Sequence, residues 1–113
     1  MKELPENLTT IGDFAFAGYN NYMNFTGELI IPNSVTKIGN TAFQKCSGFT
    51  GDLIIPNGVT TIGDYAFFRC SGFNGTLTLP ENLTSIGYEA FYQCSGFTGS
   101  LILPDNLTSI GDY

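Results

Sequence analysis

One stretch of sequence decides the fold: LIIPNGVTTIGDYAFFRC, residues 53–70. Close copies of it recur on both sides. Proline stands at positions 32, 56, 80 and 104, which are 24 residues apart, and an Ile-Gly pair, an Ala-Phe pair and a cysteine recur in step with it. A fixed period of this length is typical of a solenoid, in which one small unit cannot bury its apolar side without its neighbours.

Each repeat has the same expected local structure. Leu53–Ile55 and its copies predict a short strand that ends at the proline, which cannot donate to a strand ladder. A proline turn then leads to a second extended piece, Val59–Ile62. Asp64 is a candidate N-cap for a short helical turn that runs to Cys70 and closes at Ser71-Gly72.

Stacking of these coils would place neighbouring strands parallel, ~4.8 Å apart. The apolar positions would then align as inward columns: Leu29/Leu53/Leu77/Leu101, Ile38/Ile62/Ile86/Ile110, Phe16/Phe43/Phe67/Phe91 and Phe25/Phe49/Phe73/Phe97.

The domain organisation predicted from this period is a single solenoid over residues 1–113. Repeats are expected at 4–30, 31–54, 55–78 and 79–102, with a partial repeat at 103–113. The first repeat holds three extra residues within 20–24, which we expect to emerge as a loop. Both ends fall inside a repeat, so we expect the chain to be part of a longer array. Open end coils favour head-to-tail stacking of further coils.

Composition excludes several functions. The formal net charge of -6 argues against nucleic acid and anionic membrane surfaces as partners, because little positive charge is present to neutralise phosphates. The longest apolar run is too short to cross a bilayer, and the N-terminal residues do not form a secretory signal peptide. Histidine is absent, which removes the commonest general base and metal ligand.

The repeated cysteines and carboxylates have structural explanations. Cys46, Cys70 and Cys94 are odd in number and share one register, so we expect reduced, buried thiols, although neighbouring cysteines would lie within disulfide reach. Asp64 and its copies could form a calcium ladder, but helix capping explains them without a cation. The sequence therefore predicts no catalytic residues, no metal site and no cofactor.

The outward positions are the candidate partner-binding residues. Alternation along the strands puts an apolar stripe on the open face. Aromatic residues occupy the variable positions on the side of the predicted helical turns. Contact with a partner and cover by neighbouring coils explain these aromatic residues equally well. The insertion adds further unpaired apolar side chains. The candidates are Ile30, Ile54, Thr78 and Ile102 on the strands, Phe68 and Tyr92 on the helical side, and Tyr19, Tyr22 and Met23 in the insertion.

The string Leu-x-Ile-Pro-x-x-Val-Thr-x-Ile-Gly-x-x-Ala-Phe-x-x-Cys, clearest from Leu53 to Cys70, resembles the BspA-like leucine-rich repeat. The resemblance covers essentially the whole chain. It implies a leucine-rich-repeat solenoid, an α/β repeat rich in β structure, with a parallel sheet on one side and short helical turns on the other. Members of this family are typically surface or secreted proteins of host-associated bacteria and some protozoan parasites. Asn82-Leu83 and Asn106-Leu107 depart from the general asparagine–residue–leucine pattern, so the usual asparagine ladder is not expected.

The resemblance implies a non-catalytic adhesion scaffold, on the cell surface or secreted, that presents a repeat face to a host protein or glycan. The alternative is a structural protein whose copies stack head to tail into fibres. The pattern carries over no catalytic residues, and no nucleophile–base pair or metal constellation is present to suggest an enzyme.

Overall fold

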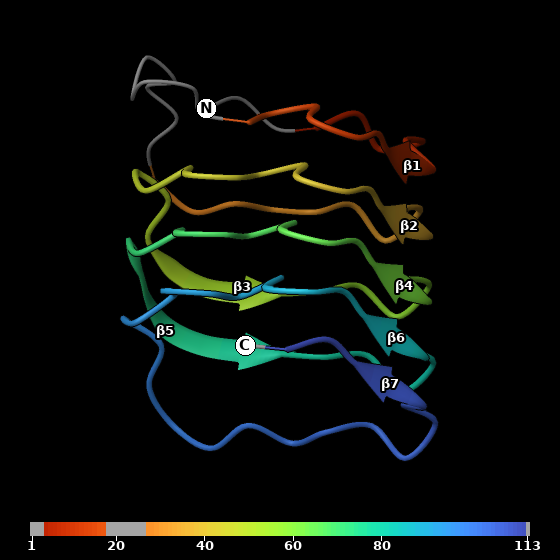
Figure 1. The fold of residues 1–113 in the computed structure, drawn as a ribbon. Coiled ribbons are helices and arrows are strands. Elements are labelled where there is room, and N and C mark those ends of the chain that lie inside the picture. Colours follow the sequence, from red (N-terminus) through yellow and green to blue (C-terminus); the bar gives the residue numbers. More distant parts are fainter. Residues whose placement is uncertain (1–3, 18–26, 113) are drawn as a thin grey trace.

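The computed structural model describes residues 4–17 and 27–112, and residues 1–3, 18–26 and 113 lie outside this description. The described coils stack into a solenoid with extents of 37 × 30 × 22 Å, and the chain advances from β1 at one end to its last coil at the other (Figure 1). Parallel pairing of equivalent residues in successive coils, predicted from the period, is confirmed.

The longest sheet in the described part of the chain lies along one side of the stack. It consists of five two-residue strands in the order β1 (Thr10–Ile11), β2 (Lys37–Ile38), β4 (Thr61–Ile62), β6 (Ser85–Ile86) and β7 (Ser109–Ile110). Every neighbouring pair is parallel, and each isoleucine pairs with the isoleucine of the next coil. The second extended piece of each repeat therefore carries this sheet.

The strands expected before each proline form only in part, which corrects the sequence prediction. Two of them, β3 (Gly51–Ile54) and β5 (Phe73–Thr78), pair in parallel, with Leu53 beside Leu77. The register shifts between Gly51 and Leu53, where the Asp52 side chain accepts the backbone N–H of Thr76 at 2.8 Å. The equivalent segments 29–31 and 101–103 have no strand pairing. Proline follows all four of these expected segments directly and ends each of them, because it has no N–H to donate.

The predicted helical turns are wrong: no helix forms in residues 4–17 and 27–112. Between Gly63 and Cys70, alternate N–H groups make different bonds. The N–H of Ala66 closes a tight turn onto Gly63 O at 3.3 Å, whereas the N–H of Phe67 crosses to Ala90 O of the next coil at 2.8 Å. A helix would use all of these groups within its own segment.

Left-handed backbone prevents the helix. Tyr65 and Arg69 both have φ of 58°, and equivalent residues of the other coils adopt similar values. A left-handed residue costs roughly 1–2 kcal/mol and interrupts a right-handed helix. Lateral hydrogen bonds between coils offset this cost, so these segments form a third hydrogen-bonded side of the stack.

Asp64 does not cap a helix, which corrects a second prediction. Its Oδ1 accepts the backbone N–H of Tyr88 at 2.8 Å, in the next coil. Asn40 Oδ1 accepts the N–H of Asp64 at 2.9 Å in the same way, so these side chains form a ladder along the stack. The ladder explains the glycine beside it: a Cβ on Gly63 would lie 2.6 Å from the Asn40 backbone nitrogen and 2.5 Å from its Oδ1.

The core is one continuous seam of stacked side chains. Phe43 and Phe67 are fully buried and stack with ring centroids 5.2 Å apart, and Phe67 stacks on Phe91 at 5.3 Å. A second stack joins Phe49 to Phe73 at 6.1 Å. The expected inward columns are thus present in the middle coils. They open towards the last coil, where Leu101 and Ile110 are each 52% exposed.

The cysteines form a thiol ladder inside this seam. The thiols of Cys46, Cys70 and Cys94 donate to the backbone oxygens of Phe16, Phe43 and Phe67 in the preceding coil, at 2.9, 2.9 and 3.0 Å. Burial raises the pKa of the Cys46 thiol to about 12 and that of Cys94 to about 11, and it raises the pKa of Cys70 further. The thiols therefore act as neutral donors within the core. Cys46 and Cys70 are buried as predicted, and Cys94 is half-buried.

Candidate functional site

The first candidate surface is the isoleucine stripe, which we define as Ile30, Ile54, Thr78 and Ile102. All four side chains are exposed, with Ile54 at 55% and Ile102 at 81%, whereas Leu53 and Ile55 on either side of Ile54 are buried. Alternation along an extended chain produces this contrast, because successive side chains point to opposite faces. The outward orientation predicted for the stripe is confirmed.

Two shallow grooves border the stripe, and carboxylates line both. A groove of about 180 Å³ runs between Ile30 and Ile54, with Glu28 and Asp52 at its wall. A second groove of about 390 Å³ includes Thr78 and Ile102, with Glu81 beside them. The stripe is therefore an apolar strip with acidic margins.

The second surface is an aromatic cluster of Tyr65, Phe68, Tyr88 and Tyr92. Phe68 stacks on Tyr92 with centroids 5.3 Å apart and meets Tyr65 edge-on at 5.5 Å, and Tyr65 meets Tyr88 edge-on at 5.7 Å. Tyr88 is 39% exposed, and the other three are half-buried. The predicted aromatic residues Phe68 and Tyr92 are thus brought together, and each covers part of the other.

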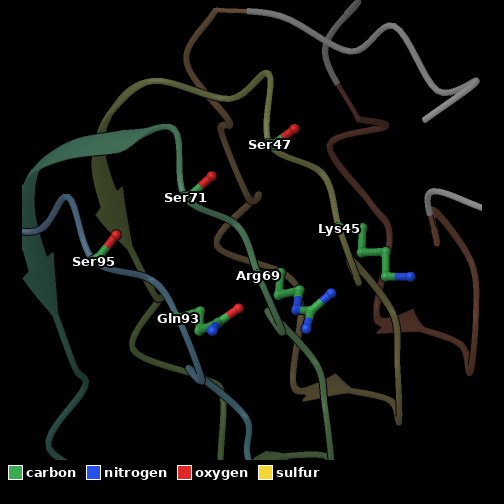
Figure 2. A pocket seen from close by; sticks show the side chains of 6 residues that line it. All are labelled: Lys45, Ser47, Arg69, Ser71, Gln93 and Ser95. Atoms are coloured by element: carbon green, nitrogen blue, oxygen red, sulfur yellow. The ribbon is translucent and has the colours of Figure 1, made fainter. Parts of the chain in front are cut away.

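The third surface is a polar groove of about 560 Å³ that crosses three successive coils. Figure 2 shows its lining side chains in two parallel rows, one of long side chains and one of serines. Each long side chain immediately precedes the cysteine of its coil, and each serine follows it. The rows are Lys45, Arg69 and Gln93, and Ser47, Ser71 and Ser95.

Backbone turns hold the long side chains of this groove outside the core. Lys45, Arg69 and Gln93 have φ of 60°, 58° and 57°. The N–H of Lys45 donates to Phe68 O of the next coil at 2.7 Å, and the following residue closes a turn from Cys46 N–H to Phe43 O at 3.1 Å. The same two bonds recur at Arg69 and Cys70. Hydrogen bonds to the next coil and within the same coil therefore fix the backbone that lines the groove.

The aromatic cluster also orients the central cation of the groove. The guanidinium carbon of Arg69 lies 5.2 Å from the centroid of the Phe68 ring, within the range of a cation–π contact. Phe68 is itself stacked on Tyr92. This contact restricts the position of Arg69 without neutralising its charge.

The sequence prediction missed this groove. Lys45, Arg69 and Gln93 recur with the same 24-residue period as the cysteines, and that period was the signal that could have identified them as one row. Tyr19, Tyr22 and Met23, the candidates in the first-repeat insertion, lie outside the described residues.

Within the described ranges, no group of three or more His, Cys, Asp or Glu side chains is placed to hold a metal ion. No described segment forms a helix long and apolar enough to span a bilayer.

The sequence matches the family model described as BspA type Leucine rich repeat region, in six copies over residues 2–113. Searches of curated proteins and of solved structures found no match. The matched range includes every strand and turn described above.

Proposed function

Because the chain belongs to the BspA-type leucine-rich-repeat family, as its repeat pattern predicted, we propose that it is a non-catalytic binding scaffold at a cell surface. The family is generally associated with surface binding. The proposed partner is a host protein that lies across the isoleucine stripe. The exposed stripe is the single observation that carries this proposal.

The stripe is unusual for a solvent-facing strand surface. Ile30, Ile54 and Ile102 occupy outward positions where water favours polar residues, and they belong to one face. Complete burial of an isoleucine side chain contributes ~1.5–3 kcal/mol. The Ile30 and Ile54 side chains are already about half-covered, so a partner that covers the rest gains roughly 1 kcal/mol from each, whereas Ile102 is 81% exposed and contributes more. Such an apolar strip, rimmed by polar groups, is typical of a protein-interaction site.

The margins of the stripe indicate the charge of the partner. Glu28, Asp52 and Glu81 line the two grooves beside it, and the whole chain carries a net charge of -6. A partner surface with apolar side chains flanked by lysine or arginine complements this arrangement. Complementary charge raises the rate of association and opposes wrong partners.

The experiment compares wild type with an Ile54→Thr/Ile102→Thr variant for binding to a panel of purified extracellular matrix proteins. Threonine already occupies the same position at Thr78, so the coil accommodates it. We expect the double variant to lose about tenfold or more in affinity, since two apolar contacts are removed. Lys37→Thr, on an exposed residue of β2 outside the stripe, is the control and should bind like wild type. Equal binding by the double variant would refute the proposal.

A second candidate function is end-to-end stacking of copies. Leu101, Leu103 and Ile110 are half-exposed, whereas their equivalents Leu53, Ile55 and Ile62 are buried. A further coil, from the same chain or from another copy, would cover them. Light scattering across a dilution series tests stacking by copies. Leu101→Glu should abolish a concentration-dependent mass, whereas Ile102→Glu, one residue away on the outer face, should not.

A further inference from the structure

We propose that the polar groove of Lys45, Arg69 and Gln93 binds an acidic sugar chain, one that carries a carboxylate or sulfate group. The groove shares no residue with the isoleucine stripe. This inference therefore goes beyond the proposed function and does not depend on it.

The charge of the groove is the first argument. The chain has only four basic residues against ten acidic ones, yet two of the four line this groove and none of its six lining side chains is acidic. Lys45 and Arg69 occupy equivalent positions in adjacent coils, ~5 Å apart along the stack. Among the described residues neither forms an ion pair with a carboxylate. One anionic group can therefore meet an arginine fork and a lysine ammonium together.

The rest of the groove is neutral and suited to hydroxyl groups. Gln93 and the three serines offer amide and hydroxyl groups that both donate and accept hydrogen bonds. Sugar hydroxyls have the same dual character. Within the described part of the chain, the hydroxyls of Ser47, Ser71 and Ser95 form no hydrogen bond with protein. The groove thus combines one cationic end with a row of unengaged hydroxyls and an amide.

Two other anionic partners fit less well. A nucleic acid or another dense polyanion needs a longer row of cations than the two present here. An acidic peptide would need partners for its own backbone, but the N–H groups of Lys45 and Arg69 are already donated to Phe68 O and Tyr92 O. None of the six residues that line the groove is an aliphatic or aromatic residue that would hold an apolar side chain of a peptide.

The size and rigidity of the groove agree with this ligand class. Its volume of about 560 Å³ lies within the ~300–1,000 Å³ range of small-ligand sites. Arg69 is held over the Phe68 ring, and the backbone beneath it is hydrogen-bonded to the next coil. A pre-positioned guanidinium loses less freedom when the ligand binds.

Calorimetric titration with three tetrasaccharides tests the proposal. One is derived from hyaluronan and carries carboxylate, one from carrageenan carries sulfate, and cellotetraose is neutral. We expect at least one acidic sugar to bind about tenfold or more tightly than cellotetraose, with an affinity that falls as salt is raised. Which acidic sugar binds better identifies the anionic group. Equal binding of all three, or no binding of either acidic sugar, overturns the proposal, as does tighter binding of a hexaglutamate peptide.

Matched substitutions then locate the site. Arg69→Gln should weaken binding about tenfold, because one charged contact is lost. Glutamine already stands at the same turn position in Gln93, so the backbone accommodates this change. Lys45→Gln should act similarly, whereas Lys37→Gln removes the same charge outside the groove and should change affinity less than about twofold. If Lys37→Gln is as damaging as Arg69→Gln, only net charge matters and the site is wrong.

Discussion

Truncation of Phe67 to alanine is the sharpest test of the stacked core. The Phe67 ring is fully buried and lies between two parallel rings, Phe43 at 5.2 Å and Phe91 at 5.3 Å. Removal of a buried phenylalanine ring costs ~3–5 kcal/mol, and the two lost ring contacts favour the upper end of that range. A chain of this length has a total stability of roughly 6–17 kcal/mol, so a large part of it depends on one side chain.

Thermal and urea unfolding followed by circular dichroism measure this cost. We expect the free energy of unfolding to fall by about 4–5 kcal/mol, with a midpoint lower by roughly 15–20 °C. The neighbouring residue is the control, because Phe68 is only half-buried on the outer side. Phe68→Ala should cost about half as much or less. A loss below about 1.5 kcal/mol for Phe67→Ala, or an equal loss for both variants, contradicts the burial of the Phe67 ring in the stacked core.

Three further predictions concern the ladders along the stack. Asp64→Ala should lower the free energy of unfolding in urea by ~1 kcal/mol, because a backbone N–H of the next coil loses its acceptor. Asp64→Asn keeps a side-chain oxygen and should be nearly neutral. Equal losses for the two variants would exclude the ladder. Gly63→Ala should lower the free energy of unfolding by ~1–3 kcal/mol, because the added Cβ would meet the backbone of the adjacent coil. Gly12→Ala should cause no such loss, because nothing lies within 4 Å of its added Cβ. Equal tolerance of both changes would contradict the close packing of coils. Stability should fall as pH rises from 9.0 to about 12, because the unfolded chain ionises the Cys46 thiol first, and Cys46→Ala should show a shallower decline.

The sequence predicted the architecture well because its period is unusually regular. Equal spacing of Ile38, Ile62 and Ile86 implies one parallel column, and the observed register pairs them. The buried and exposed sides of Leu53, Ile54 and Ile55 followed from simple alternation. Repetition thus supplied long-range information that a single copy of the motif lacks.

The helical turns could not be excluded from the sequence. The left-handed positions carry Phe14, Thr41, Tyr65 and Glu89, and none of these is glycine or asparagine, the usual residues at positive φ. Their conformation is imposed by hydrogen bonds to the adjacent coil, such as that from Tyr65 N–H to Tyr88 O. Local sequence does not contain this tertiary cause, so a helix was the natural expectation.

The polar groove was missed for a related reason. Lys45, Ser47 and their equivalents are ordinary solvent-facing residues in one copy of the repeat. Only the stack aligns them into rows, and only the positive φ of Lys45, Arg69 and Gln93 directs their side chains out of the turn. The role of Asp64 was misassigned because capping is a contact within one segment, whereas its carboxylate acts between coils.

Methyl NMR tests the central claim, binding of a protein partner across the isoleucine stripe, most directly. Outward and inward isoleucines lie side by side at Ile30-Ile31 and at Ile54-Ile55, so these two coils each contain an internal control. With isoleucine δ1 methyls labelled, a partner that binds in the matrix-protein panel is titrated into the chain. We predict that signals of Ile30, Ile54 and Ile102 shift or broaden while those of Ile55 and Ile62 change little. Binding without a change at the three outward methyls would contradict the account.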